Sequence, residues 1–262
     1  MKIEHHHKIG FFDVDHQFKL RVQSVARFFQ EIAVVHSTKI GVGPEVLLEK
    51  GFVWFLHRLE IEFFRYPMLG EDIVITTWSR GFEGVKGFRE YRIHTTSQVE
   101  IARGSSVWLF YDFKRKRISR VPGKISTRYA VEKETSFDTE INDWETCGKI
   151  QPEQEMDISL RYSDFDVNGH VNNTIYLGFL ETLYQRTINT NGRPIRNIKI
   201  RFCREIDRTK ERIRCGWHKT NGVYQFNIFD DSTLYADAEI IPMECGNDME
   251  KENRWGKDLK YP

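Results

Sequence analysis

The chain has 262 residues and nearly balanced charge, with 39 lysines and arginines against 38 aspartates and glutamates, for a formal net charge of +1. This length suits two domains of moderate size, and the charge balance excludes bulk attraction to nucleic acid. Apolar runs fall far short of the roughly 20 residues that cross a bilayer, and the mean hydropathy is −0.53. Because its N-terminal stretch has no apolar signal core, we expect a soluble protein of the cytoplasm.

The first half of the sequence predicts an N-terminal strand or arm, a long helix and then several strands. Residues 24–40 repeat apolar side chains at helical spacing, namely at Val25, Phe28, Phe29, Ile32 and Ala33. Residues 52–64 alternate apolar and charged side chains, which is the period of a half-buried strand. Further strand-like runs follow at IVITTW, GFREYRIHTT and IARGSSVWLFYDF, separated by turn-forming residues.

The same order of elements begins again at residue 160. A strand-like entry and a polar turn precede a helix over residues 173–188, and the strand IRNIKIRF follows. GVYQFNI at 222–228 then corresponds to GFREYRI at 87–93. This pattern predicts a duplication of one α+β unit, with an acidic, polar linker over residues 131–157.

One long helix wrapped by an antiparallel sheet is the hotdog architecture. The fold class that we predict is therefore α+β, a tandem double hotdog fold whose two sheets meet edge to edge. The expected boundaries are an N-terminal hotdog domain at 1–125, a linker at 126–156, a C-terminal hotdog domain at 157–246 and a charged C-terminal tail at 247–262.

Residues 163–173, SDFDVNGHVNN, gather acids, amides and one histidine around a glycine. Read from Asp164, the string opens like a calcium loop, but its twelfth position is Ile175, where such a loop needs a bidentate carboxylate. Read from Asp166, it is a polar turn that delivers Asp166, Asn168 and His170 to the start of a helix. Asp166 and Asn168 are also ordinary turn residues, so the turn alone does not establish a function.

The stretch RYSDFDVNGHVNNTIYLGFLE, with IRFCREIDRTKERI further along, resembles the second hotdog of acyl-acyl carrier protein thioesterases. In the first half, LHRLEIEFFRYPMLGEDIVITTW and RGSSVWLFYDFKRKRISRVP resemble the corresponding stretches of that family. The resemblance covers roughly residues 8–245. It implies that the catalytic residues are Asp166, Asn168, His170 and Glu205.

Hydrolysis of a thioester needs an activated nucleophile and stabilisation of the oxyanion. A helix beginning near Asn172 offers unpaired N–H groups to that oxygen. Glu205, expected on the following strand, would activate water or attack directly, and His170 would pass a proton to the departing thiolate. Asn168 would hold the water or the substrate, and Asp166 would orient the turn.

Plant members of the family carry a cysteine directly after the glutamate, where this chain has Ile206. This difference favours chemistry without a thiol, or a non-hydrolytic descendant. Cys203 would share a face with Glu205 if the strand continued, but proximity alone does not make it a nucleophile. The other cysteines, Cys147, Cys215 and Cys245, are far apart, so we expect buried reduced thiols and neither a zinc site nor disulfides.

The first copy lacks these groups, because Tyr66 occupies the position of Glu205 and no AspXAsnXHis turn precedes its helix. This half is expected to bind the acyl chain. The aromatic residues that could line its tunnel, or be plain core, are Phe28, Phe29, Trp54, Phe55, Phe63 and Phe64.

The resemblance implies release of free fatty acid from fatty acyl-acyl carrier protein, which terminates chain elongation. It implies no cofactor, because the substrate brings its own phosphopantetheine. A coenzyme A thioesterase on the same fold and a non-catalytic acyl-binding protein remain open alternatives. The basic run at Lys114, Arg115, Lys116 and Arg117 could face an acidic carrier protein, or be a solvated hairpin end. The sequence leaves open both the chain-length preference and association into a homodimer.

Overall fold

The computed structural model describes residues 1–189 and 192–244. The tail expected at 247–262 and Cys245 lie outside the described residues. The strands are β1 Ile3–Lys8, β2 Phe52–Phe63, β3 Asp72–Glu83, β4 Lys86–Thr95, β5 Glu100–Asp112, β6 Arg117–Ile118, β7 Gln154–Ser159, β8 Ile195–Phe202, β9 Arg212–Thr220, β10 Val223–Phe229 and β11 Leu234–Pro242. The helices are α1 Val22–Lys39, α2 Pro44–Glu49, α3 Gly123–Ser126 and α4 Asn173–Thr187, and short 3-10 turns occur at Phe11–Asp13 and Tyr162–Asp164.

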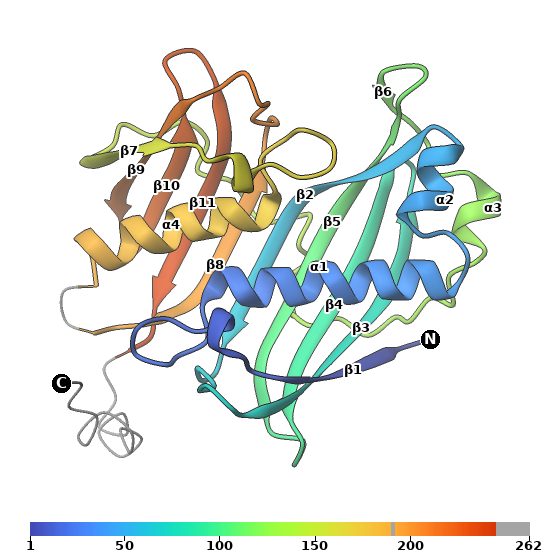
Figure 1. Ribbon diagram of the computed structural model, residues 1–262, viewed down its shortest axis with the longest axis horizontal. Helices are drawn as coiled ribbons and strands as arrows, with labels where there is room; N and C mark the ends of the chain where they lie inside the picture. The colour runs from blue at the N-terminus through green and yellow to red at the C-terminus, as the bar shows by residue number, and fades with distance from the viewer. Residues whose placement is uncertain (190–191, 245–262) are drawn as a thin grey trace.

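The strands form one antiparallel sheet with the order β1-β3-β4-β5-β2-β8-β11-β10-β9-β7, and β6 pairs with β5 (Figure 1). Within the sheet, β2 is the last strand of the first unit and β8 is the first strand of the second unit. These two strands pair with each other. At this junction Leu59 lies opposite Ile200 and Ile61 opposite Ile198, and all four side chains are buried. The predicted edge-to-edge tandem arrangement is confirmed.

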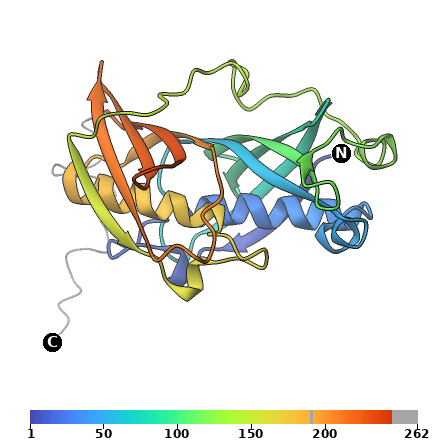
Figure 2. The same ribbon diagram turned by 90° about the horizontal axis from the view of Figure 1, so that it is seen from above.

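The long helices α1 and α4 cover one face of the sheet (Figure 2). They run antiparallel and overlap along their N-terminal halves (Figure 1). Close approach is possible because α4 carries Gly178, where an added Cβ would lie only 2.6 Å from the side-chain oxygen of Gln23 on α1. The N-terminus of each helix therefore lies beside the middle of the other.

The segment between α3 and β7 crosses the opposite face of the sheet (Figure 2). It is packed there, because Ser136, Ile141 and Trp144 are all buried. β7 begins at Gln154, inside the segment expected to be linker, and joins the sheet beside β9. The sequence missed this start because Gln154 and Glu155 are polar and exposed, so that the apolar alternation of β7 is limited to Met156 and Ile158.

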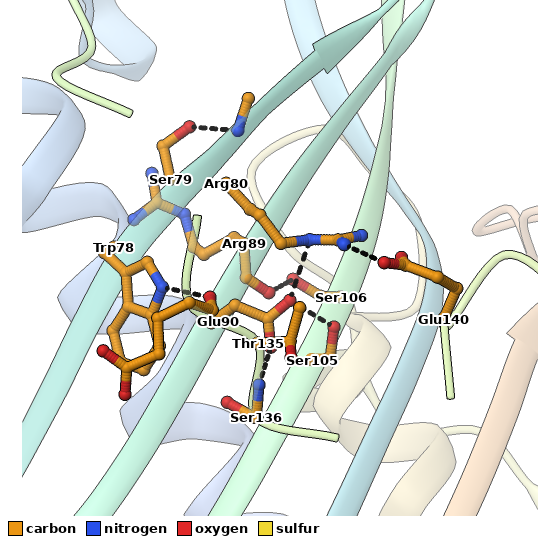
Figure 3. Close-up of polar contacts among 12 residues, drawn as sticks. Trp78, Ser79, Arg80, Arg89, Glu90, Ser105, Ser106, Thr135, Ser136 and Glu140 are labelled. Atoms are coloured by element: carbon orange, nitrogen blue, oxygen red, sulfur yellow. Dashed lines mark hydrogen bonds and ion pairs between the residues drawn. The ribbon is translucent and has the colours of Figure 1, made fainter. Parts of the chain in front are cut away.

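Glu90 on β4 is buried and ties this segment to the sheet. Its carboxylate accepts hydrogen bonds from Ser105 Oγ and from the Ser136 N–H, both at 3.0 Å, and lies 3.2 Å from Arg80 Nε (Figure 3). Arg80 also pairs with Glu140 of the crossing segment. Removing the buried carboxylate would leave these donors without their acceptor.

We expect Glu90→Ala to lower the free energy of unfolding by about 3 kcal/mol, since it leaves Ser105 Oγ, the Ser136 N–H and Arg80 Nε without their buried acceptor. The measurement is urea denaturation at pH 8, above the pKa of about 7 to which burial raises Glu90. Glu140→Ala is the matched control, because it removes the other carboxylate that pairs with Arg80. The Glu140 side chain is 46% exposed. That variant should lose less than about 1 kcal/mol, and equal losses in the two variants would contradict the assignment.

Candidate active site

The polar turn before α4 is organised by Asp166. Its Oδ1 accepts the N–H groups of Asn168 at 2.8 Å and of His170 at 3.3 Å. The Asp166 N–H donates to the His170 carbonyl at 2.8 Å, which closes the turn. Gly169 occupies the left-handed region at φ +77°, where glycine is favoured. The structure therefore places Asp166, Asn168 and His170 together, with the carboxylate holding the backbone of the turn.

Glu205 joins this group from the chain that follows β8. Its Oε2 lies 3.4 Å from His170 Nε2. The approach is fixed by backbone contacts of the two residues that follow Glu205, because the Val171 N–H donates to the Ile206 carbonyl at 2.9 Å and His170 forms a β-bridge with Asp207. The expectation that Glu205 sits on a strand is wrong, since β8 ends at Phe202 and the chain then turns toward the histidine.

The electrostatics of the pair suit a general base. Desolvation by burial raises the pKa of Glu205, the His170 charge opposes this shift, and the nearby Asp166 carboxylate adds to it. The Glu205 side chain is nevertheless 44% exposed, so water can reach it. A carboxylate with a raised pKa accepts a proton from water more readily than an ordinary glutamate does.

The N-terminus of α4 keeps a free N–H beside this turn. Asn172 is the N-cap, and its side-chain oxygen accepts the Thr174 N–H at 2.9 Å. The Asn172 N–H is itself bound to the Asp164 carbonyl. Within residues 1–189 and 192–244, no acceptor is paired with the Asn173 N–H. This group points out of the first turn of a helix and can receive an oxygen that gathers negative charge.

A cavity of about 520 Å³ connects the turn to the first unit. Asp166, Asn168 and Asn172 belong to its lining. The rest comes largely from apolar side chains of the first unit, including Val42, Leu47, Val53, Trp54, Phe82 and Phe88. A cavity with a polar turn and an apolar remainder fits an acyl chain with a reactive head group.

Of the six aromatic residues that could line a tunnel or be plain core, Trp54 alone lies in this lining. Phe28, Phe29 and Phe63 are packed in the core, and Phe64 is 44% exposed.

The basic residue in the lining is Arg89, which points away from the neighbouring Glu90 (Figure 3). Its guanidinium donates to His36 Nδ1 at 2.9 Å. Burial lowers the pKa of His36 to about 4, so this imidazole is neutral at pH 7 and can accept that bond.

The cysteines differ from the expected buried thiols. Cys215 is fully buried and Cys147 is partly buried, but Cys203 is exposed. Because Cys203 lies beyond the end of β8, the argument that it shares a strand face with Glu205 does not apply. Its Sγ lies 3.9 Å from an Asp237 oxygen. Desolvation and the charge of Asp237 both raise its pKa, which disfavours the thiolate.

The calcium interpretation fails on the side chain that would begin the loop. Asp164 is buried, and its carboxylate accepts the Arg161 N–H at 2.8 Å and pairs with the Arg161 guanidinium at 2.8 Å. It is therefore bound to Arg161 rather than free to converge with Asp166 and Asn168 on a cation. Over the described ranges, no group of three or more His, Cys, Asp or Glu side chains could hold a metal ion.

Sequence reasoning missed a second turn of the same form before α1. Asp15 Oδ1 accepts the N–H groups of Gln17 at 2.8 Å and of Lys19 at 3.0 Å, as Asp166 does in the second unit. The sequence signal for this turn was Asp15, which precedes the start of α1 by the same number of residues as Asp166 precedes the start of α4. Tyr66 takes the place of Glu205, but its hydroxyl donates to the Ile195 carbonyl at 2.8 Å, and burial raises its pKa far above the usual tyrosine value. This turn lacks both the histidine and the carboxylate base.

Comparison with known protein families covers both units of the sheet. A model of the acyl-ACP thioesterase N-terminal domain matches residues 1–129, and one of the acyl-ACP thioesterase C-terminal domain matches residues 147–241. The chain belongs to the acyl-ACP thioesterase family. The two matched segments correspond to the two hotdog units of the sheet.

Individual relatives are more distant. The chain is 27% identical over 172 residues to acyl-[acyl-carrier-protein] hydrolase FATB3, chloroplastic, of Cuphea viscosissima, covering 61% of this chain and 41% of the relative. It is 26% identical over 186 residues to oleoyl-acyl carrier protein thioesterase 1, chloroplastic, of Arabidopsis thaliana, covering 65% of this chain and 51% of the relative. The chain thus spans about half, or less, of the length of these curated relatives.

Solved structures share the whole fold. An acyl-ACP thioesterase from Bacteroides thetaiotaomicron superposes with a TM-score of 0.81 at 18% identity, covering 92% of this chain and 98% of that chain. The 12:0-ACP thioesterase from Umbellularia californica superposes with a TM-score of 0.78 at 17% identity, covering 92% and 97%. At this identity the likeness establishes the double hotdog fold. Among the helices of the described residues, none is long and apolar enough to cross a membrane.

We expect Glu205→Gln to lower turnover of an acyl thioester by about a hundred- to ten-thousand-fold, because the amide keeps the shape but cannot accept a proton. Circular dichroism should show an unchanged fold. Cys203→Ala is the control and should stay within a few-fold of the parent. An inactive alanine variant beside an active glutamine variant would make Cys203 the nucleophile.

The pKa of Glu205 also predicts the acid side of the pH profile. A base must be deprotonated to act, so kcat/KM should fall as pH drops through a value above the usual glutamate pKa of about 4.3. Asp166→Asn removes a charge that raises this pKa and keeps a side-chain oxygen for the turn. The midpoint should therefore move to lower pH in that variant. A midpoint that stays in place or rises would show that another group sets this limb.

Proposed function

We propose that this protein hydrolyses the thioester of fatty acyl-acyl carrier protein, releases free fatty acid and so terminates acyl chain elongation. The observation that carries the proposal is the cavity of about 520 Å³ that joins apolar walls of the first unit to the Asp166 turn of the second. Membership of the family supports the same reaction. Asp166, Asn168, His170 and Glu205 are the residues to which we assign the chemistry.

In the proposed reaction, water attacks the thioester carbonyl and Glu205 takes one of its protons. The carbonyl oxygen gathers negative charge, which the free Asn173 N–H and the positive end of α4 stabilise. The carbon–sulfur bond then breaks, and His170 gives a proton to the departing thiolate. The proton on Glu205 returns to His170 across the 3.4 Å contact, which restores both groups. Asn168 holds the water or the substrate, and Asp166 holds the turn.

Two other functions share this fold. A coenzyme A thioesterase would use the same site with a different carrier, and a non-catalytic acyl-binding protein would fill the cavity without turnover. An assay with one acyl group presented on acyl carrier protein and on coenzyme A separates all three. Turnover with a higher kcat/KM on the carrier protein supports the proposal, whereas binding without turnover on either donor would overturn it.

The carrier is proposed to dock at the β5–β6 hairpin. Lys114, Arg115, Lys116 and Arg117 are all exposed there. The hairpin projects beside α2 (Figure 1), and Leu47 and Leu48 of α2 line the cavity. A cluster of exposed cations would attract an acidic protein at a distance. Cytoplasmic location and a homodimer stay predictions from the sequence, and the plant relatives are chloroplastic by name.

We expect charge reversal of Lys114, Arg115 and Lys116 to raise the KM for acyl-acyl carrier protein several-fold more than the KM for acyl-coenzyme A. The reason is that exposed charges steer a charged macromolecular partner and act less on a small donor. Steady-state kinetics with both donors at low and high salt provide the measurement. Equal changes for the two donors, or no change, would remove this hairpin from the docking surface.

A further inference from the structure

The turns at Asp15 and Asp166 correspond position by position in their backbone hydrogen bonds. This correspondence continues into the helices α1 and α4. Leu20 donates its N–H to the Pro67 carbonyl at 2.9 Å, and Val171 donates to the Ile206 carbonyl at the same distance. The helices then begin two residues later in each unit, at Val22 and Asn173. A position in α1 therefore corresponds to the position 151 residues further along in α4.

The N-terminus of α1 is filled by a carboxylate from the other unit. Glu181 on α4 accepts the Val22 N–H at 3.1 Å and approaches the Gln23 N–H at 3.5 Å. Burial raises the pKa of Glu181 to about 7, and these two N–H groups oppose the shift. The first-unit place that matches the proposed oxyanion site thus holds a side-chain oxygen of the protein itself, which accepts the N–H groups at the start of the helix.

The residue equivalent to Glu181 is Gln30 on α1, and it lies at the N-terminus of α4. Gln30 lines the large cavity together with Asp166, Asn168 and Asn172. It also lines a smaller cavity with Asn173 and Thr174. Among the described residues, the side-chain amide of Gln30 has no hydrogen-bond partner. The nearby Asn173 N–H has no acceptor either. Val22, the counterpart of Asn173, is bound to the Glu181 carboxylate.

We propose that Gln30 contacts the substrate, and that its side-chain N–H and the Asn173 N–H together receive the oxygen of the thioester carbonyl. This inference rests on the proposed function. The bonds of Glu181 show that the N–H groups at this place of a helix N-terminus donate to an acceptor oxygen from the other unit. A neutral amide at position 30 leaves the place open and adds a donor, whereas a carboxylate there would occupy it. The first unit thus contributes one group to the chemistry of the second.

The test compares Gln30→Met, which keeps the length but removes the donor, with Gln30→Glu, which supplies the carboxylate found in the other unit. Removing one donor of this kind typically lowers kcat by about a hundred- to a thousand-fold, so Gln30→Met should lose at least tenfold in kcat with a smaller change in KM. Gln30→Glu should lose more at pH 8. Glu181→Gln is the control, because it changes the cap of α1 and should keep kcat within about threefold of the parent. Melting temperatures verify that each variant is folded.

A pH series separates contact with the substrate from a structural role. Activity of Gln30→Glu relative to the parent should rise as pH falls from 8 to 6, because protonation removes the competing charge. Asp166 and Arg89 line the same cavity, and His170 and Glu205 belong to the same site, so the ratio to the parent at each pH removes their common titration. Folded Gln30 variants with parental kcat would overturn the inference, as would a Gln30→Glu ratio independent of pH. An inactive parent protein would instead overturn the proposed function.

Discussion

The antiparallel pairing of β2 with β8 is the contact on which the rest of the structure depends. It joins two sheets into one and buries the side chains of Leu59, Ile61, Ile198 and Ile200 along the junction. Because the sheet is continuous, the helices on its face must lie side by side, and α1 and α4 overlap along their N-terminal halves. The N-terminus of each helix thereby lies beside a residue of the other unit, Glu181 at α1 and Gln30 at α4. A single hotdog unit could not enclose the cavity, since its lining comes from both.

This arrangement creates two helix N-termini in similar surroundings but with different occupants. Free N–H groups and the helix dipole attract negative charge at both. In the first unit Glu181 satisfies them internally, and the result is a closed, stable end. In the second unit the facing residue is Gln30, and the Asn173 N–H has no acceptor among the described residues. The change from carboxylate to amide alters little in volume and much in charge, which is why it can separate a structural end from a reactive one.

Regular elements and the polar turn could be predicted from the sequence because they depend on local spacing. The periodicity of residues 195–202 gave β8 with its observed bounds, and the turn at Asp166 followed from residue types and a glycine. The position of Glu205 could not be predicted in this way, because the chain leaves β8 to meet His170, a contact between distant residues. The sequence left open for a similar reason whether Phe28 and Phe63 line a tunnel or belong to the core, where the structure places both. Gln30 could not be identified from the sequence, because its position beside the N-terminus of α4 is known only from the structure.

The chemistry assigned to the second unit requires no thiol, and the local electrostatics explain why. Cys203 would need to ionise to act as a nucleophile, but desolvation and Asp237 raise its pKa. Desolvation also raises the pKa of Glu205, but here the same shift strengthens a base and leaves it charged above that pKa. Its exposed fraction of 44% admits water to the carboxylate. One physical effect, desolvation, thus disfavours the sulfur as a nucleophile and favours the oxygen as a base.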